Sequence, residues 1–214
     1  METRQSPESI GDNVALGGSW THRLARPLIR PLIGTAVKPN HITTLRVLTA
    51  LAACIALASG NRSGEIWGGV IWVLSAFLDR ADGELARIGG QTSDWGHLYD
   101  YWSDVSSNAL FFVAIGIGLR DSALGWWAIP MGLVSCAAVA ATSILAEELE
   151  KRDGSGEKAF SGVGNFDADD VYYLFGPVAW LGWLVPFLVG TTIGATVVAL
   201  VTWWRLQRMP KPSS

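Results

Sequence analysis

The sequence predicts an all-α integral membrane protein with six transmembrane helices and an N-terminal interfacial amphipathic helix. Three observations point to this fold class. Half of the 214 residues are hydrophobic and only 16% are charged, against roughly 25% in an ordinary soluble domain. Six stretches approach the roughly 20 mostly apolar residues that a helix needs to cross a bilayer. Lys and Arg gather in alternate loops between those stretches, which is the pattern of the positive-inside rule.

Composition also excludes several classes of protein. The apolar content is too high for a disordered chain. The net charge of −3, with no basic stripe, argues against a nucleic-acid polymer as partner. The only two cysteines are Cys54 and Cys136, so a disulfide framework and a multi-cysteine zinc site are excluded.

The predicted spans differ in how clearly they are bounded. The apolar parts of the first four lie at 47–59, 66–78, 105–119 and 125–146. The last two share residues 171–204, which we divide near 189–192. Of the loops on the opposite side, only Arg62 and Arg120 carry a positive charge. Both termini are therefore expected on the cytoplasmic side, and an even number of spans agrees with that parity.

Residues 18–37 precede the first span and mix apolar side chains with Arg23, Arg26 and Arg30. This mixture predicts a basic amphipathic helix that lies on an anionic leaflet. The alternative is a disordered basic tail, since Pro27 and Pro31 would break or kink a helix. The N-terminus lacks the continuous apolar region of a cleavable signal peptide.

Four aspartates follow the second span. If that helix continues past Leu78, Asp79 and Asp82 fall on one of its faces, together with Gly83, Ala86 and Arg87. Gly89-Gly90 then ends the helix, and Ser93 or Asp94 can cap the next one. On that third helix Gly96, Asp100 and Asp104 are each four residues apart. Two antiparallel helices thus present two aspartates each to a shared space.

Such a cluster points to cations and phosphate chemistry. Four converging carboxylates repel one another and stay ionised only beside positive charge. Oxygen ligands without His or Cys suit Mg²⁺, Mn²⁺ or Ca²⁺ rather than zinc, and four aspartates are enough for two ions. A two-metal site stabilises the attacking and leaving oxygens of a phosphoryl displacement, and the planar fork of Arg87 suits phosphate. The alternative is a set of exposed aspartates at a helix end, which leaves their spacing unexplained.

The pattern Asp-x2-Asp-Gly-x2-Ala-Arg-x8-Gly-x3-Asp-x3-Asp resembles the signature of the CDP-alcohol phosphotransferases (CDP-alcohol phosphatidyltransferases). This chain has all eight of its fixed residues. They are Asp79, Asp82, Gly83, Ala86, Arg87, Gly96, Asp100 and Asp104. The segment Pro39-Asn40-His41-Ile42-Thr43 also resembles the Pro-Asn-x-x-Thr that opens the family's first helix.

The resemblance implies a transferase of phospholipid biosynthesis that displaces CMP from a CDP-alcohol with the hydroxyl of an acceptor alcohol. It implies two divalent cations, Mg²⁺ or Mn²⁺ with Ca²⁺ as an expected inhibitor, and a homodimer. Asp79, Asp82 and Asp100 would bind metal, with Asp104 as a shared ligand and general base. Catalysis would thus fall to Asp104 and Asp100. Donor contacts would come from Gly83, Ala86, Arg87, Asn40 and Thr43.

On this interpretation the chain has a cytoplasmic N-terminal segment over residues 1–38, a six-helix membrane catalytic domain over 39–208 and a cytoplasmic tail over 209–214. The small size fits a bacterial enzyme of the inner membrane with CDP-diacylglycerol as donor and a cytoplasmic active site. The alternatives are a divalent-cation transporter, whose acidic residues would be expected near mid-span, and a purely structural membrane protein.

The acceptor alcohol is the least determined part. No Lys or Arg occurs at 121–150 or 159–204, so only Lys151, Arg152 and Lys158 are available to bind a phosphorylated acceptor. Asp167, Asp169 and Asp170 either cap the fifth helix or favour a neutral polyol or amino alcohol. We expect Glu147, Glu148 and Glu150 to form a solvated helix end, and His97 to lie outside the first shell of the site.

Overall fold

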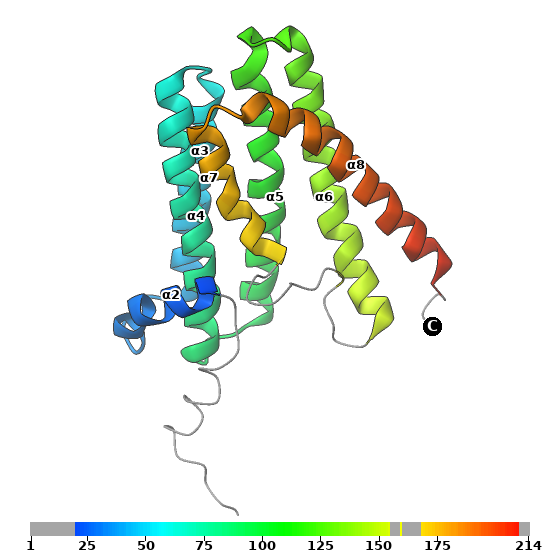
Figure 1. Cartoon of the computed structure of the whole chain (residues 1–214). Helices are drawn as coiled ribbons and strands as arrows, with labels where there is room; N and C mark the ends of the chain where they lie inside the picture. The colour runs from blue at the N-terminus through cyan, green and yellow to red at the C-terminus, as the bar shows by residue number, and fades with distance from the viewer. Residues whose placement is uncertain (1–19, 155–158, 160–167, 210–214) are drawn as a thin grey trace, which may run out of the picture.

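The computed structural model describes residues 20–154, 159 and 168–209, and the whole of this part is helical or connecting (Figure 1). Its long helices are α3 (Pro39–Ala58), α4 (Arg62–Ile88), α5 (Asp94–Gly118), α6 (Ala128–Asp153) and α8 (Leu184–Arg208). The shorter elements are α2 (Trp20–Ile29), η1 (Arg30–Leu32), η2 (Leu119–Asp121), η3 (Gly125–Trp127), η4 (Ala168–Leu174) and α7 (Phe175–Trp180).

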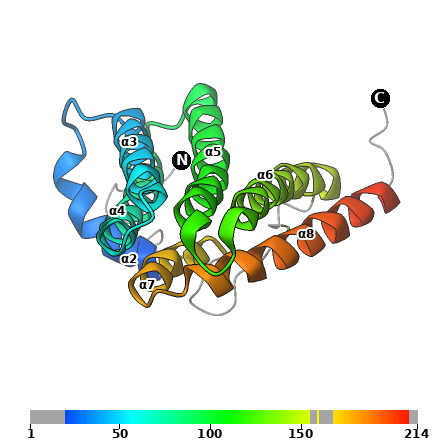
Figure 2. The ribbon, with the colours of Figure 1, turned by 90° about the horizontal axis from the view of Figure 1, so that it is seen from above.

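The helices α3, α4, α5 and α6 run beside one another, and α8 crosses obliquely over α6 (Figures 1 and 2). Four of the described helices are long and apolar enough to cross a membrane. They lie in Pro39–Ala58, Asp94–Asp121, Gly125–Asp153 and Leu184–Arg208. The chain is therefore an all-α membrane protein. The helix α4 is also long, but its second half is rich in charge, so six crossings remain a prediction.

The predicted division of the last apolar region near 189–192 is wrong. A seven-residue 3-10 helix, η4, and the six-residue helix α7 precede the break, which falls at Gly182 with a left-handed φ of 72°. Beyond it, α8 is continuous. The hydroxyl of Thr192 donates to the Leu188 carbonyl at 2.7 Å, so this polar residue is satisfied inside the helix. The combined η4 and α7 segment is shorter than the roughly 20 residues of a full crossing.

The predicted turn after the aspartate-bearing helix is confirmed. The helix α4 continues to Ile88, and Gly90 turns the chain with a φ of 62° that a side chain would make costly. The Ser93 hydroxyl accepts a hydrogen bond from the Gly96 amide at 3.0 Å and caps α5. The second half of α4 and the first half of α5 are therefore antiparallel neighbours.

The N-terminal part of the described chain forms a helix, α2, which tolerates Pro27 inside it. One face packs on α4, where Ala25 and Ile29 are buried and Arg26 pairs with Glu84 at 3.2 Å. Leu24 and Leu28 are exposed on the other side. The structure thus places α2 across the end of α4; its contact with a membrane surface remains a prediction.

An aromatic cluster fixes the helices that carry the aspartates. The ring of Trp72 on α4 lies 4.3 Å from that of Phe111 on α5. Phe175 of α7 lies 4.6 Å from Phe111 and 5.0 Å from Phe187 of α8. These rings are buried or half-buried, and Trp72 is about two helical turns from Asp79. Burial of these large rings holds α4 and α5 at a fixed spacing about two helical turns from Asp79.

Candidate metal and transfer site

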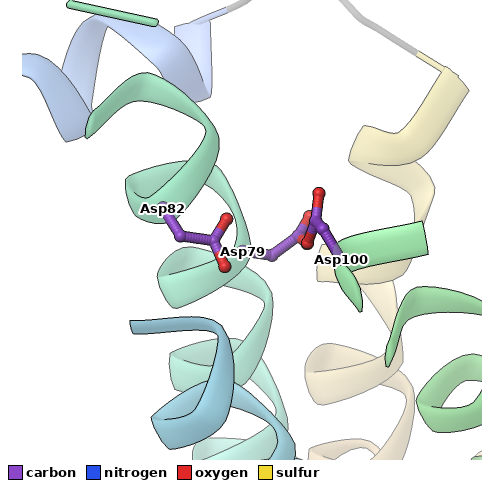
Figure 3. Close-up of side chains that lie close together, drawn as sticks. All are labelled: Asp79, Asp82 and Asp100. Carbon is purple, nitrogen blue, oxygen red and sulfur yellow. The ribbon is translucent and has the colours of Figure 1, made fainter. Parts of the chain in front are cut away.

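Three of the four predicted aspartates converge between α4 and α5. One carboxylate oxygen each from Asp79, Asp82 and Asp100 lies within 4.8 Å of the others. Figure 3 shows the Asp79 and Asp82 side chains leaving α4 toward Asp100 of α5. The structure therefore brings together the shared face that the spacing of the sequence predicts.

Asp82 is the most enclosed member of the cluster, with an exposed fraction of 2%. Within the described part of the chain neither of its carboxylate oxygens accepts a hydrogen bond. The nearby Thr43 hydroxyl donates to the Pro39 carbonyl at 3.3 Å. A buried carboxylate without hydrogen bonds is costly in free energy. A bound cation would compensate the buried charge of Asp82.

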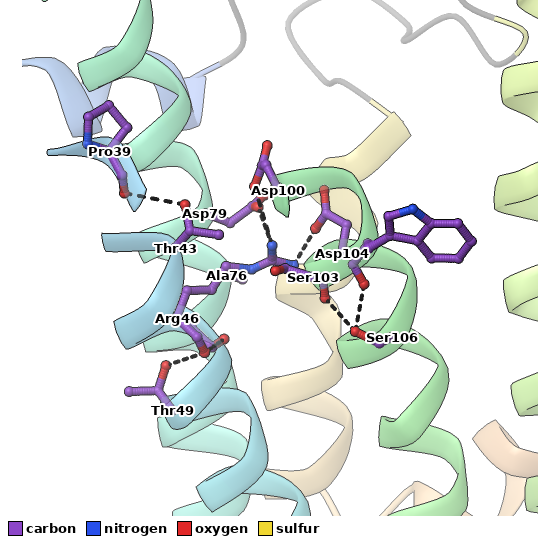
Figure 4. Close-up of polar contacts among 12 residues, drawn as sticks. Pro39, Thr43, Arg46, Thr49, Ala76, Asp79, Asp100, Ser103, Asp104 and Ser106 are labelled. Carbon is purple, nitrogen blue, oxygen red and sulfur yellow. Dashed lines mark hydrogen bonds and ion pairs between the residues drawn. The ribbon is translucent and has the colours of Figure 1, made fainter. Parts of the chain in front are cut away.

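Arg46 of α3 lies among the aspartates, and our sequence analysis did not identify it (Figure 4). Its Nη1 is 3.1 Å from Asp79 Oδ1 and 3.6 Å from Asp100 Oδ1, and its Nη2 donates to Asp104 Oδ1. The side chain is only 4% exposed. Arg46 directly precedes the predicted apolar stretch 47–59, but the structure places it inside the candidate membrane span Pro39–Ala58, where an arginine is expensive and by default functional.

Asp104 stands apart from the three converging carboxylates. Its oxygen accepts the hydrogen bond from Arg46, and its side chain is 41% exposed. It also lines a cavity of about 570 Å³ that opens between α5 and α6. Asp104 therefore contacts Arg46 at the aspartate cluster and also borders the cavity.

The predicted donor-binding residues lie at the same end of α4. A side chain at Gly83 would meet no atom within 4 Å, so this helix position faces free space. Arg87 is half-exposed and pairs with the fully buried Glu84, a contact that the sequence analysis did not predict. Ala86 is half-buried on the same turn. The space beside Gly83 can accept a bulky ligand.

The Pro-Asn segment at the start of α3 lies near this end of the bundle. A side chain placed at Gly96 would come within 3.3 Å of the Asn40 side-chain oxygen, so α3 and α5 approach closely there. Thr43 is buried one turn further along α3. Both residues are positioned beside the cluster, and their contact with a donor remains a prediction.

The cavity beside Asp104 changes the interpretation of two glutamates. Glu147 and Glu150 of α6 line it together with His97 of α5, so their side chains border this cavity in addition to lying at a helix end. Toward this end α6 diverges from α5 (Figure 1), and the cavity lies between the two helices.

Asp170 has a structural position instead of lining the cavity. It is buried, accepts a hydrogen bond from Thr21 at 2.9 Å and lies 3.5 Å from Arg80. It thereby ties η4 to α2 and α4. Asp167 and the side chain of Asp169 lie outside the part of the chain that the structure describes.

The residues present fit divalent cations. Four carboxylates gather around a single guanidinium, so negative charge exceeds positive charge at the cluster. Hard oxygen donors are the ligands that Mg²⁺ and Mn²⁺ prefer. One carboxylate oxygen each from Asp79, Asp82 and Asp100 lies within 4.8 Å of the others, so these three residues would hold such a cation between them.

A helical membrane bundle with a carboxylate cluster between two of its helices fits a membrane enzyme of phosphate transfer. The family model for CDP-alcohol phosphatidyltransferases matches residues 36–203. The chain belongs to that family, whose members are transferases of substituted phosphate groups. Membership favours the transferase prediction over the transporter and the purely structural protein.

Two relatives and one solved structure are similar to this chain. It is 32% identical over 99 residues to archaetidylinositol phosphate synthase of Pyrococcus horikoshii, covering 45% of this chain and 51% of that protein. It is 34% identical over 90 residues to phosphatidylinositol phosphate synthase of Streptomyces avermitilis, covering 42% and 36%. The chain thus matches about half or less of the length of these relatives.

The crystal structure of Mycobacterium tuberculosis phosphatidylinositol phosphate synthase with CDP-DAG bound has a TM-score of 0.57 and 17% identity to this chain. The match covers 89% of this chain and 91% of that one. At this level of identity the comparison supports the fold alone. The metal ligands, the donor contacts and the acceptor are therefore argued from this chain's own residues.

Proposed function

We propose that this protein transfers a phosphatidyl-type group from CDP-diacylglycerol to an acceptor alcohol, with release of CMP, and that divalent cations are required. The observation that carries the proposal is the convergence of Asp79, Asp82 and Asp100, with a buried Asp82 that makes no hydrogen bond in the described structure. The CDP-DAG bound to the related fold supports the choice of donor. The names of the relatives make an inositol phosphate the first acceptor to compare.

Asp79, Asp82 and Asp100 would hold Mg²⁺ or Mn²⁺, with Asp104 as a shared ligand to a second ion. When bound, the cations stabilise negative charge on the transferring phosphate and on the leaving CMP. Ca²⁺ is larger and accepts more ligands, so we expect it to bind and inhibit. Arg46 neutralises part of the carboxylate charge and sets the positions of Asp79 and Asp104.

Asp104 is placed to act as general base because it borders both the cluster and the cavity. In the proposed step the acceptor hydroxyl oxygen bonds to the phosphorus that carries diacylglycerol. The bond from that phosphorus to the bridging oxygen breaks, and this oxygen leaves with CMP. The hydroxyl proton passes to the Asp104 carboxylate. Asp100, which lies 3.6 Å from Arg46, would help to position the cation beside the reacting phosphate.

The donor would bind on the side of Gly83, away from the cavity. Free space at Gly83 admits the nucleotide, and half-exposed Arg87 can turn its outer N–H groups to the phosphates while Glu84 fixes its position. Ala86, Asn40 and Thr43 would complete this side. The donor and acceptor would then reach the aspartates through different openings, with the attacking and leaving oxygens in line at the phosphorus, as a direct displacement requires.

We also propose six membrane crossings, a bacterial inner-membrane location, cytoplasmic termini and a homodimer. The distribution of Lys and Arg supports the orientation. The helix α8 carries exposed apolar residues such as Ile193, Val197 and Leu200, which need lipid or a second copy around them. Cross-linking in native membranes tests the homodimer directly.

The experiment is an assay of CMP release from CDP-diacylglycerol by purified protein in detergent. We expect EDTA to abolish activity and Mg²⁺ or Mn²⁺ to restore it. Asp82→Asn should lower activity by roughly 100-fold or more through loss of a ligand. In EDTA the same variant should melt no lower than the wild type, because it removes a buried charge without hydrogen bonds.

The matched control is Asp121→Asn, since Asp121 is exposed at the far end of α5. Full activity in metal-free buffer, or equal effects of Asp82→Asn and Asp121→Asn, would refute the proposal. Uptake of Mn²⁺ by proteoliposomes without CMP release would favour a transporter instead.

A further inference from the structure

The cavity beside Asp104 reaches the proposed reacting centre from between α5 and α6. Its volume is about 570 Å³, which is in the range of pockets that enclose small molecules. Asp79 and Asp104 form its inner end, and α5, α6, η4 and α8 supply the walls. Asp82 and Gly83 do not line it. A molecule in this cavity would present its hydroxyl to Asp104 without occupying the donor side.

The α6 wall of the cavity accepts hydrogen bonds more readily than it donates them. The Thr142 hydroxyl donates to the Ala138 carbonyl at 2.8 Å, and the Ser143 hydroxyl donates to the Val139 carbonyl at 3.2 Å. Each hydroxyl has one proton, so its lone pairs are what remain for a ligand. A ligand rich in N–H and O–H donors fits such a wall, whereas a phosphate dianion brings only acceptors.

Charge on the cavity wall agrees with this. Among the described residues that line it, four are carboxylates, one is the imidazole of His97, and none is Lys or Arg. The two cations that follow along α6 are each paired with a glutamate: Lys151 lies 2.7 Å from Glu147, which lines the cavity, and Arg152 lies 2.8 Å from Glu148, which does not. A phosphorylated acceptor would meet like charge in this space.

We infer that the acceptor is an alcohol that carries an ammonium group and no phosphate, and that Glu147 binds the ammonium. This inference rests on the proposed function, because it assigns the second substrate of the same transfer. Of the two acceptor classes that the sequence favours, a neutral polyol and an amino alcohol, it selects the amino alcohol, and it names Glu147 as the residue that distinguishes them.

Glu147 is better placed for this role than Glu150. Glu150 accepts a hydrogen bond from the Ala159 amide at 2.7 Å and thereby holds the chain that follows α6. The partner of Glu147 is Lys151, whose side chain is 65% exposed while that of Glu147 is 29% exposed. Exposed pairs of this kind contribute little stability. A ligand ammonium inside the cavity can displace Lys151 into water at small cost.

The test measures CMP release at fixed CDP-diacylglycerol with matched acceptors. Ethanolamine is compared with ethylene glycol, and glucosamine with glucose. Inositol 1-phosphate and glycerol 3-phosphate represent the phosphorylated class. We expect the ammonium-bearing member of at least one pair to react fastest of all. Glu147→Gln should raise the KM for that acceptor by roughly 10- to 100-fold, as loss of one charge-assisted hydrogen bond does, with a smaller change in kcat.

The control is Glu148→Gln, which lies on the same helix, pairs with Arg152 and does not line the cavity. Glu148→Gln should leave the KM for the acceptor and the KM for CDP-diacylglycerol unchanged. Thermal melting checks that both variants fold. Faster CMP release with a phosphorylated acceptor or with a neutral partner of each pair would overturn the inference while supporting the transferase. Equal effects of the two substitutions would also overturn it. If the protein released no CMP with any of these acceptors, even with Mg²⁺ or Mn²⁺ added, the proposed function itself would fail.

Discussion

Arg46 offers the sharpest test of how the cluster balances its charge. We consider Arg46→Met, which keeps much of the side-chain volume and removes the guanidinium. The lost contacts are those at 3.1 Å to Asp79 and 3.6 Å to Asp100, together with the hydrogen bond to Asp104. The perturbation removes the guanidinium that contacts three of the four aspartates.

The magnitude follows from burial. At an effective dielectric constant of about 20, unit charges at these separations attract by about 5 kcal/mol each before desolvation and screening are subtracted. Asp100 and Asp104 are partly exposed, so screening removes much of this attraction. Removing one partner from a buried ion pair costs about 3–5 kcal/mol in practice. In a chain of this size that corresponds to a fall of about 6–20 °C in the melting temperature.

The assay is thermal unfolding in detergent with EDTA and with excess Mg²⁺. Because bound cations supply positive charge to the same carboxylates, Mg²⁺ should raise the melting temperature of Arg46→Met by more than it raises that of the wild type. The exposed Arg30 provides the control, Arg30→Met, which should behave as wild type in both buffers. An equal deficit of Arg46→Met with and without Mg²⁺ would show that Arg46 acts through packing, and the charge-balance argument would be refuted.

Three further substitutions test the roles assigned around the cluster. Asp104→Asn should lower kcat by roughly 10²- to 10⁴-fold with little change in donor KM, because it removes the general base; normal turnover would place the base elsewhere. Arg87→Lys should weaken CDP-diacylglycerol binding, measured by titration calorimetry, by about 1–3 kcal/mol through loss of the bidentate fork; unchanged affinity would mean that Arg87 serves only Glu84. Gly83→Ala should leave folding intact or stabilise it by up to about 1 kcal/mol, since its new methyl meets no atom within 4 Å, yet raise donor KM; equal KM values would show that the nucleotide binds elsewhere.

The sequence by itself determined the helical membrane fold, the turn at Gly89-Gly90, the Ser93 cap and the shared face of Asp79, Asp82 and Asp100. These features depend on short-range rules: apolar length, the helical repeat and capping chemistry act over a few residues. Because α4 and α5 are joined by a short turn, their facing positions could be predicted from spacing alone.

The tertiary structure decided what these faces meet. Arg46 reaches the aspartates from α3, and Glu147 reaches the cavity from α6, which are helices that no local spacing relates to the motif. Asp170 was taken into an ion pair with Arg80 because η4 packs beside α4. The break at Gly182 replaced the expected division near 189–192 because Thr192 satisfies its hydroxyl within α8. Long-range packing sets which side chains meet, and no periodicity in the sequence records that choice.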